Sequence, residues 1–114
     1  MPGITTHVLD TSRGRAAAGV RVRLEHFDDV AGEWIDLGTT HTDADGRVVN
    51  LPVDTKQPSG GQYRLTFDTG AYFQSSGTPC FYPSVTIAFE TTDEQHYHVP
   101  LLISPFGYST YRGS

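Results

Sequence analysis

The sequence predicts an all-β protein, an antiparallel β-sandwich of two sheets with one short helix. Apolar and polar residues alternate with a period of two in several segments, as they do in half-buried strands. Clusters of glycine, proline, aspartate and serine separate these segments at short intervals. No long stretch has apolar residues at helical spacing. Six to eight short strands joined by turns are therefore expected.

The first half of the chain supplies three of these strands. Residues 4–10 ("ITTHVLD") form the first. In residues 20–27 ("VRVRLEHF") two valines and a leucine share one face, and two arginines and a glutamate share the other. Residues 33–42 ("EWIDLGTTHT") form a third strand that ends at the turn "DADGR", residues 43–47. The Asp-Gly pair in that turn is a strong signal for a tight connection.

Three further strands with the same alternation follow in the second half. A loop is expected at residues 56–62 ("KQPSGGQ"), directly before a strand at residues 62–68 ("QYRLTFD"). The other two lie at residues 84–90 ("SVTIAFE") and 96–103 ("HYHVPLLI"). In the last of these, the two histidines lie on the face opposite the apolar side chains.

Two segments remain, and each has its own signal. Residues 68–76 ("DTGAYFQSS") form the one expected helix, of two turns at most, with Asp68 as its N-cap. After Pro105, residues 106–114 ("FGYSTYRGS") alternate weakly and are rich in tyrosine, a strand former. A final strand is therefore expected to place the closing "YRGS" on an ordered edge or at an interface.

Length and composition limit the classes of function. A single domain spanning residues 1–114 is expected. The net charge of −5 disfavours a nucleic-acid partner, because phosphates attract a basic surface. No apolar run has membrane-spanning length, so no membrane partner is expected. The single Cys80 and the lack of a visible secretory signal predict a cytoplasmic location.

Histidines are the candidates for chemistry, and spacing alone leaves their role open. The ordinary interpretation of His96 and His98 is a pair of solvated or hydrogen-bonded side chains. Two imidazoles on one strand face can also share a metal ion, and His7 would be the third ligand of a catalytic zinc site. Arg47, just after the Asp-Gly turn, is by the same reasoning a solvated side chain.

Two segments of the chain resemble the signature regions of a known family. They are residues 4–25 ("ITTHVLDTSRGRAAAGVRVRLE") and 96–114 ("HYHVPLLISPFGYSTYRGS"). They resemble the transthyretin-like family and, within it, the branch of 5-hydroxyisourate hydrolases, for which the terminal "YRGS" is highly specific. Three middle segments agree with this resemblance: 42–48 ("TDADGRV"), 63–73 ("YRLTFDTGAYF") and 81–90 ("FYPSVTIAFE").

The resemblance implies a transthyretin-like sandwich, a homotetramer, and site residues at named positions. The tetramer would be a dimer of dimers with the active sites at the dimer–dimer interface, and no metal or other cofactor would be required. The implied catalytic residues are His7, Arg47, His98 and Ser114. The implied substrate-binding residues are His7, Arg47, Tyr111, Arg112 and Gly113.

The reaction that the resemblance implies is a ring-opening amide hydrolysis in urate degradation. It would convert 5-hydroxyisourate to 2-oxo-4-hydroxy-4-carboxy-5-ureidoimidazoline. His98 or His7, hydrogen-bonded with Ser114, would activate a water molecule, since a histidine can accept a proton near neutral pH. Arginine side chains would bind the substrate and stabilise the oxyanion. Gly113 would let the backbone come close to the ligand.

Two alternatives belong to other functional classes. One is a metal-dependent hydrolase that uses His96, His98 and His7. The other is a carrier whose channel holds a small aromatic ligand without converting it. Turnover in the presence of a chelator distinguishes the first alternative from the metal-free hydrolase, and the absence of turnover would indicate the carrier.

Overall fold

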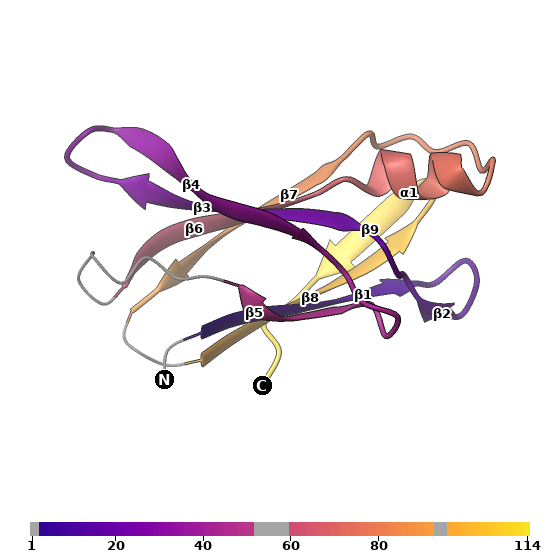
Figure 1. Cartoon of the computed structure of the whole chain (residues 1–114), viewed down its shortest axis with the longest axis horizontal. Coiled ribbons are helices and arrows are strands. Elements are labelled where there is room, and N and C mark those ends of the chain that lie inside the picture. The colour runs from indigo at the N-terminus through magenta and orange to yellow at the C-terminus, as the bar shows by residue number, and fades with distance from the viewer. Residues whose placement is uncertain (1–2, 52–59, 93–95) are drawn as a thin grey trace.

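The computed structural model describes residues 3–51, 60–92 and 96–114 and shows two β-sheets packed face to face (Figure 1). One short helix lies at an end of this sandwich. The predicted fold class is thereby confirmed. The loop predicted at residues 56–62 falls largely outside the described residues.

The first sheet has five strands and carries both the beginning and the end of the described chain. Its path runs β2-β1-β8-β9, and β5 also pairs with β1. All of these pairs are antiparallel except β1 and β8, which run parallel. The strand bounds are β1 Gly3–Asp10, β2 Arg15–Ala16, β5 Arg47–Leu51, β8 His96–Ser104 and β9 Gly107–Thr110.

The second sheet has four strands in the order β4-β3-β6-β7, all antiparallel. Their bounds are β3 Arg21–Asp28, β4 Glu33–His41, β6 Gly61–Phe67 and β7 Val85–Thr91. Helix α1, Thr69–Ser75, follows β6 directly. Its N-cap is Asp68, as predicted, because the Asp68 carboxylate accepts a hydrogen bond from the backbone N–H of Ala71. Within the described residues, no helix has the length and apolarity that crossing a membrane would require.

The predicted alternation decides which side chains form the core. In β1, every second residue from Ile4 to Asp10 is buried, and the residues between them are only partly covered.

The turn at residues 43–47 connects β4 of one sheet to β5 of the other, so the tight turn signal marks a change of sheet. Apolar side chains of both sheets meet in one core: Ile4, Val8, Ala17, Val20, Val22, Leu24, Val48, Leu51, Tyr63, Leu65, Phe67, Phe73, Val85, Tyr97, Val99, Leu101 and Ile103.

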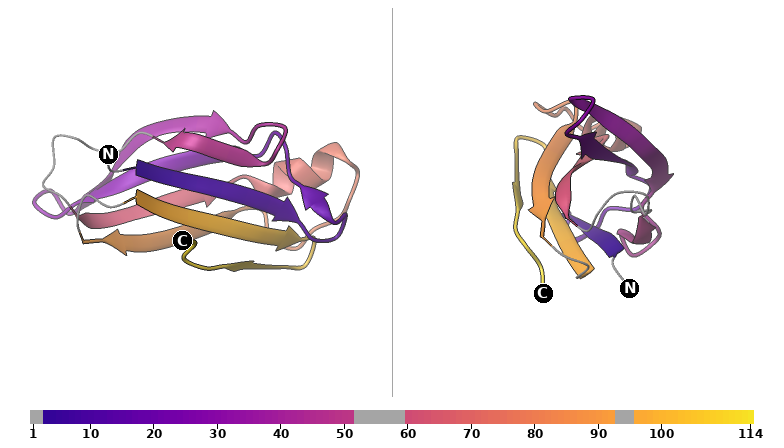
Figure 2. Two further views of the ribbon diagram at one scale, coloured as in Figure 1. Left: turned by 90° about the horizontal axis from the view of Figure 1, so that it is seen from below. Right: turned by 90° about the vertical axis from the view of Figure 1, so that its left-hand side faces the viewer.

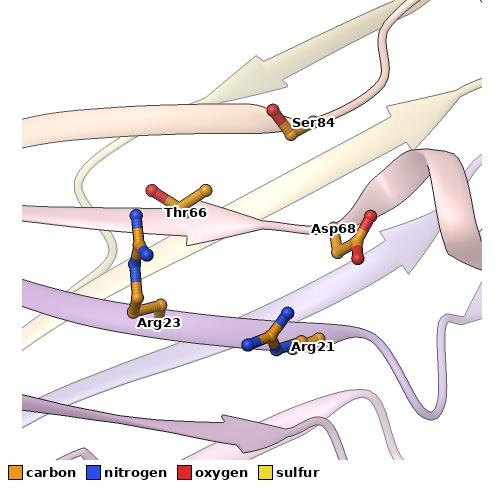
Figure 3. Close-up of a pocket in the computed structure, with 5 residues that line it drawn as sticks. All are labelled: Arg21, Arg23, Thr66, Asp68 and Ser84. Atoms are coloured by element: carbon orange, nitrogen blue, oxygen red, sulfur yellow. The ribbon is translucent and has the colours of Figure 1, made fainter.

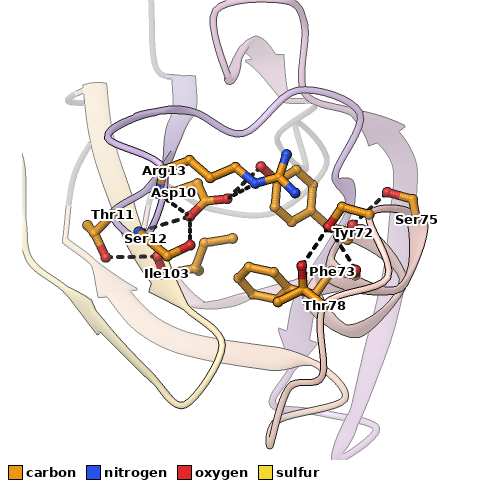
Figure 4. A network of polar contacts seen from close by, with 10 residues as sticks. Asp10, Thr11, Ser12, Arg13, Tyr72, Phe73, Ser75, Thr78 and Ile103 are labelled. Carbon is orange, nitrogen blue, oxygen red and sulfur yellow. Dashed lines mark hydrogen bonds and ion pairs between the residues drawn. The ribbon is translucent and has the colours of Figure 1, made fainter.

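A buried carboxylate joins the end of β1 to helix α1 (Figure 4). Asp10 is fully buried and accepts hydrogen bonds from the backbone and hydroxyl of Ser12, from the backbone of Arg13, and from the Tyr72 hydroxyl at 2.8 Å. Burial opposes the Asp10 charge, but these hydrogen bonds outweigh it and lower the pKa of Asp10. The helix is thus tied to the sheet by an ionised group rather than by apolar packing alone.

Candidate active site

The candidate residues gather on the outer face of the five-stranded sheet, the face turned away from the second sheet. Strand β1 lies between β5 and β8, as Figure 2 (left) shows from below. His7 of β1 is paired with Arg47 of β5, and Thr5 of β1 is paired with His98 of β8. Since residues two apart on a strand share a face, this pairing brings His7, Arg47 and His98 together.

The turn between β4 and β5 fixes Arg47 and His7 relative to each other. The Asp43 carboxylate accepts hydrogen bonds from the backbone N–H of Asp45 at 2.9 Å and of Arg47 at 3.0 Å. The backbone bond from Arg47 is the main reason that the pKa of Asp43 is lowered. Gly46 has a φ of 75°, a conformation that favours glycine. The same turn presents the Asp45 carbonyl to His7 Nε2 at 2.9 Å, and because a carbonyl only accepts, Nε2 must carry a proton.

His98 is half-buried, and its surroundings keep it neutral. The Thr5 hydroxyl lies 2.8 Å from His98 Nδ1 and 3.1 Å from His96 Nε2. Burial lowers the pKa of His98, and unfavourable electrostatic interactions of its charged form with His7, His96 and Arg47 lower it further. Sequence reasoning did not identify Thr5 as a site residue. The available signal was its position two residues before His7, on the same face of the strand.

The tail continues the β8–β9 pairing after a short interruption, so the predicted ordered edge is confirmed. The Gly113 N–H donates to the His98 carbonyl at 2.9 Å, and the two residues form an isolated bridge. A Cβ at position 113 would lie 2.5 Å from His98 Cδ2, which is closer than real Cβ contacts come. Glycine is therefore needed here so that the backbone can pass beside the His98 ring.

The other tail residues lie on either side of this bridge. Tyr111 is 60% exposed, and the Arg112 guanidinium carbon lies 5.0 Å from the ring centroid of Tyr97. A groove of about 250 Å³ separates this tail from β7 and reaches His98. Ser114 is exposed, and among the described residues its hydroxyl makes no hydrogen bond to either candidate base. The residues that line the groove are Ile87, Ala88, Phe89, Glu90, Tyr97, His98, Val99, Thr110, Tyr111 and Arg112.

Among the described residues, no third ligand for a zinc ion lies at the histidine pair. Over residues 3–51, 60–92 and 96–114, no group of three or more His, Cys, Asp or Glu side chains is placed to hold a metal ion. His96 and His98 instead meet at the Thr5 hydroxyl. The described residues thus offer a hydrogen-bonded histidine pair in place of a catalytic metal site.

A second polar pocket lies on the outer face of the other sheet (Figure 3). It has a volume of about 260 Å³ and is lined by Arg21, Arg23, Thr66, Asp68 and Ser84. Its lining has no histidine, and its one carboxylate, Asp68, already accepts the N-cap hydrogen bond from Ala71. The outer face of the five-stranded sheet is therefore the better candidate for catalysis.

Comparisons with known proteins show what the whole chain is similar to. Residues 4–113 match the family model described as the HIUase/Transthyretin family. A relative from Schizosaccharomyces pombe, named "Probable 5-hydroxyisourate hydrolase", is 45% identical over 114 residues. That alignment covers 99% of this chain and 92% of the relative.

Solved structures of two kinds share the fold. The 5-hydroxyisourate hydrolase of Klebsiella pneumoniae is 38% identical, with a TM-score of 0.83 and full coverage of both chains. Sea bream transthyretin in complex with thyroxine is 32% identical, with a TM-score of 0.88, covering 96% of this chain and 93% of that one. Since both match closely, the fold does not separate catalysis from ligand binding, and the side chains must do so.

Proposed function

This chain belongs to the HIUase/transthyretin family, and from that membership we propose that it is a hydrolase that opens the ring of 5-hydroxyisourate in urate degradation. The product would be 2-oxo-4-hydroxy-4-carboxy-5-ureidoimidazoline. One observation carries the proposal: His7, Arg47 and His98 meet on one sheet face, where a base and two donors can surround a substrate carbonyl.

His98 is the general base in this scheme. Its Nε2 makes no hydrogen bond within the described residues, whereas His7 Nε2 already donates to the Asp45 carbonyl. The lowered pKa of His98 leaves its ring neutral and able to accept a proton at pH 7. In this scheme His7 binds the substrate through its other ring nitrogen, Nδ1.

The reaction then proceeds by addition of water followed by cleavage of the amide bond. The water oxygen bonds to the ring carbonyl carbon while its proton passes to His98 Nε2. The carbonyl electrons move to oxygen, and the Arg47 guanidinium stabilises the negative charge that develops there. Collapse of this intermediate breaks the carbon–nitrogen bond, and His98 returns the proton to the departing nitrogen.

The tail supplies the remaining binding groups of the proposal. Arg112 would bind a substrate oxygen, and Tyr111 would pack against the flat ring. Ser114 follows the Gly113 bridge and would orient the attacking water beside His98. The position of Gly113 supports this scheme, because the bridge brings the last residues to the edge of the strand that carries the base.

The carrier is the second candidate, and the likeness to a thyroxine-bound transthyretin favours it. A carrier needs shape and apolar contact but no proton acceptor at the ligand carbonyl. The proposed site instead offers a neutral histidine beside an arginine, which a carrier does not use.

The deciding experiment is a time course on freshly generated 5-hydroxyisourate, followed by ultraviolet absorbance with chelator present. The full chain is compared with a variant lacking residues 111–114. We expect fast decay with the full chain only. Decay at the spontaneous rate with both proteins would refute the hydrolase and favour the carrier. Restoration of activity by added zinc would favour the metal enzyme.

We also propose that the chain works as a homotetramer, a dimer of dimers, in the cytoplasm. The site side chains lie on an outer sheet face, where Arg47 and Ser114 are exposed, and a second dimer would close this face into a channel. The free thiol of Cys80 suits a reducing compartment. Sedimentation should give about four times the 12.5 kDa of one chain, whereas full turnover by a monomer would contradict the tetramer.

A further inference from the structure

The hydroxyl of Thr5 lies between two imidazole rings on the outer face of the five-stranded sheet. Thr5 Oγ1 is 2.8 Å from His98 Nδ1 and 3.1 Å from His96 Nε2. Both distances are hydrogen-bond distances. Thr5 pairs directly with His98 across the parallel β1–β8 ladder, so the sheet itself holds this contact.

The number of hydrogens on the Thr5 hydroxyl limits which of these groups can donate and which can accept. The Thr5 hydroxyl has one hydrogen and two lone pairs, so it donates to at most one of the two rings and accepts from the other, or accepts from both. If it donates to His98, the neutral His98 ring carries its proton on Nε2. If it accepts from His98 Nδ1, the neutral His98 ring keeps its lone pair on Nε2, whether the hydroxyl donates to His96 or accepts from it as well. The direction of one hydroxyl thus decides which nitrogen of His98 is basic.

We propose that Thr5 and His96 are positioning residues for catalysis: the Thr5 hydroxyl donates to His96 Nε2 and accepts from His98 Nδ1, and so keeps His98 Nε2 as the proton acceptor. The inference rests on the proposed function, because only that function requires a base at His98. When Nε2 takes a proton from water, the bond from Nδ1 to Thr5 is already made, so no side chain has to turn.

Other groups around His98 set its charge but do not select its tautomer. His7 of β1, Arg47 of β5 and His96 of its own strand interact unfavourably with a positive charge on His98. Glu90 of β7 and Arg112 of the tail line the same groove. Among the described residues, Thr5 makes the one hydrogen bond to a ring nitrogen of His98. The β-branched threonine also has restricted side-chain rotation, which serves this positioning.

The first test reads the tautomer directly, by nitrogen-15 NMR of the histidine rings in the full chain. We expect His98 to carry its proton on Nδ1 in the unaltered protein and to become a mixture of tautomers in Thr5→Val. A proton on Nε2 of His98 in the unaltered protein would overturn the proposal. This measurement does not depend on turnover, so it stands even if the hydrolase proposal fails.

The second test separates positioning from a structural effect through kinetics. Thr5→Val should lower kcat by about tenfold to a hundredfold with little change in KM. Without the Thr5 hydroxyl, the His98 ring would spend most of its time as the tautomer or in the orientation that cannot accept a proton at Nε2. Thr5→Ser restores the hydroxyl and should recover most of the rate. Thr11→Val removes a comparable hydroxyl, which donates to the Ile103 carbonyl at 3.0 Å, and should leave the rate unchanged.

The acid limb of the pH–rate profile gives a readout that a structural role would not move. Loss of the Thr5 acceptor removes a hydrogen bond to the charged ring, so the limb should move to lower pH in Thr5→Val. His96→Leu removes a ring whose protonated form repels a charge on His98, so in this variant the limb should move to higher pH. Opposite shifts support the proposal. The proposal would be overturned if the acid limb stayed in place in both variants, or if Thr5→Val had the same kcat as the unaltered protein.

Discussion

At the scale of single residues, the charge state of His98 governs the expected pH dependence. A histidine acts as a general base only when it is neutral, and burial, together with unfavourable electrostatic interactions with its neighbours, lowers the pKa of His98. The neutral form therefore persists below the ordinary histidine value of about 6.5. We expect kcat/KM to stay flat from neutral pH down through that value and to fall only at lower pH. A pH profile in overlapping buffers measures this, and an acid limb centred above 6.5 would contradict it.

Replacing the proposed base tests its role more directly. His98→Asn should lower kcat by about 10²-fold to 10⁴-fold, the usual contribution of general base catalysis. His41→Asn is the matched control, because His41 is exposed at the end of β4 in the other sheet. Initial rates at saturating substrate give the comparison. Equal losses in the two variants would show that the effect at His98 is not specific.

At the scale of elements, the tail depends on a glycine at one point. In Gly113→Ala the added methyl would meet the His98 ring at 2.5 Å, so either the tail or the ring must move. We expect kcat to fall at least tenfold while the melting temperature changes little, because the tail adds little to the core. In Gly107→Ala the atom nearest to the added Cβ would be 3.7 Å away. This variant should therefore change kcat and the melting temperature very little.

Helix α1 is held by the Asp10–Tyr72 contact, which predicts a stability effect. Tyr72→Phe removes a donor from a buried carboxylate and should lower the free energy of unfolding by about 1.5 kcal/mol. Tyr108→Phe is the control, because Tyr108 is 45% exposed and contacts its neighbour Tyr82 through its ring. Urea unfolding at pH 7 measures both variants. A Tyr72→Phe variant as stable as the control would show that packing alone holds the helix.

Acid should weaken the same contact, and the sign follows from the pKa of Asp10. That pKa is lower in the folded protein than in the unfolded chain, so the unfolded chain takes up a proton first as the pH falls. The stability from Asp10 is therefore complete above about pH 4 and is lost on further acidification.

Local patterns predicted the elements well, but they could not predict which strands pair. Alternation and turn signals indicated the strand at residues 96–103, the helix near Asp68 and the ordered tail. Strand β5 was not predicted, because "RVVNL" is short and does not alternate cleanly. The parallel pairing of β1 with β8, and with it the Thr5–His98 contact, joins residues 93 positions apart. No local pattern encodes such a pairing, whereas the family resemblance identified His7, Arg47 and His98.

At the scale of the whole molecule, one core is shared by both sheets, which predicts a single unfolding transition. Val22 is fully buried in that core, and Val30 is 98% exposed. Val22→Ala should lower the free energy of unfolding by about 2 kcal/mol, whereas Val30→Ala should change it by less than about 0.5 kcal/mol. Urea titrations followed by circular dichroism and by Trp34 fluorescence should coincide. Two separated transitions would contradict the single-domain prediction.

The parallel β1–β8 pair also has a consequence for how the protein comes to exist in a cell. Strand β1 leaves the ribosome well before its neighbour β8, which begins only at residue 96. A ladder between such distant segments carries a large loop-closure cost and forms slowly. Until then, the edge of β1 is open to other nascent chains. The contact between Thr5 and His98 therefore cannot form until the ribosome has made the chain through β8.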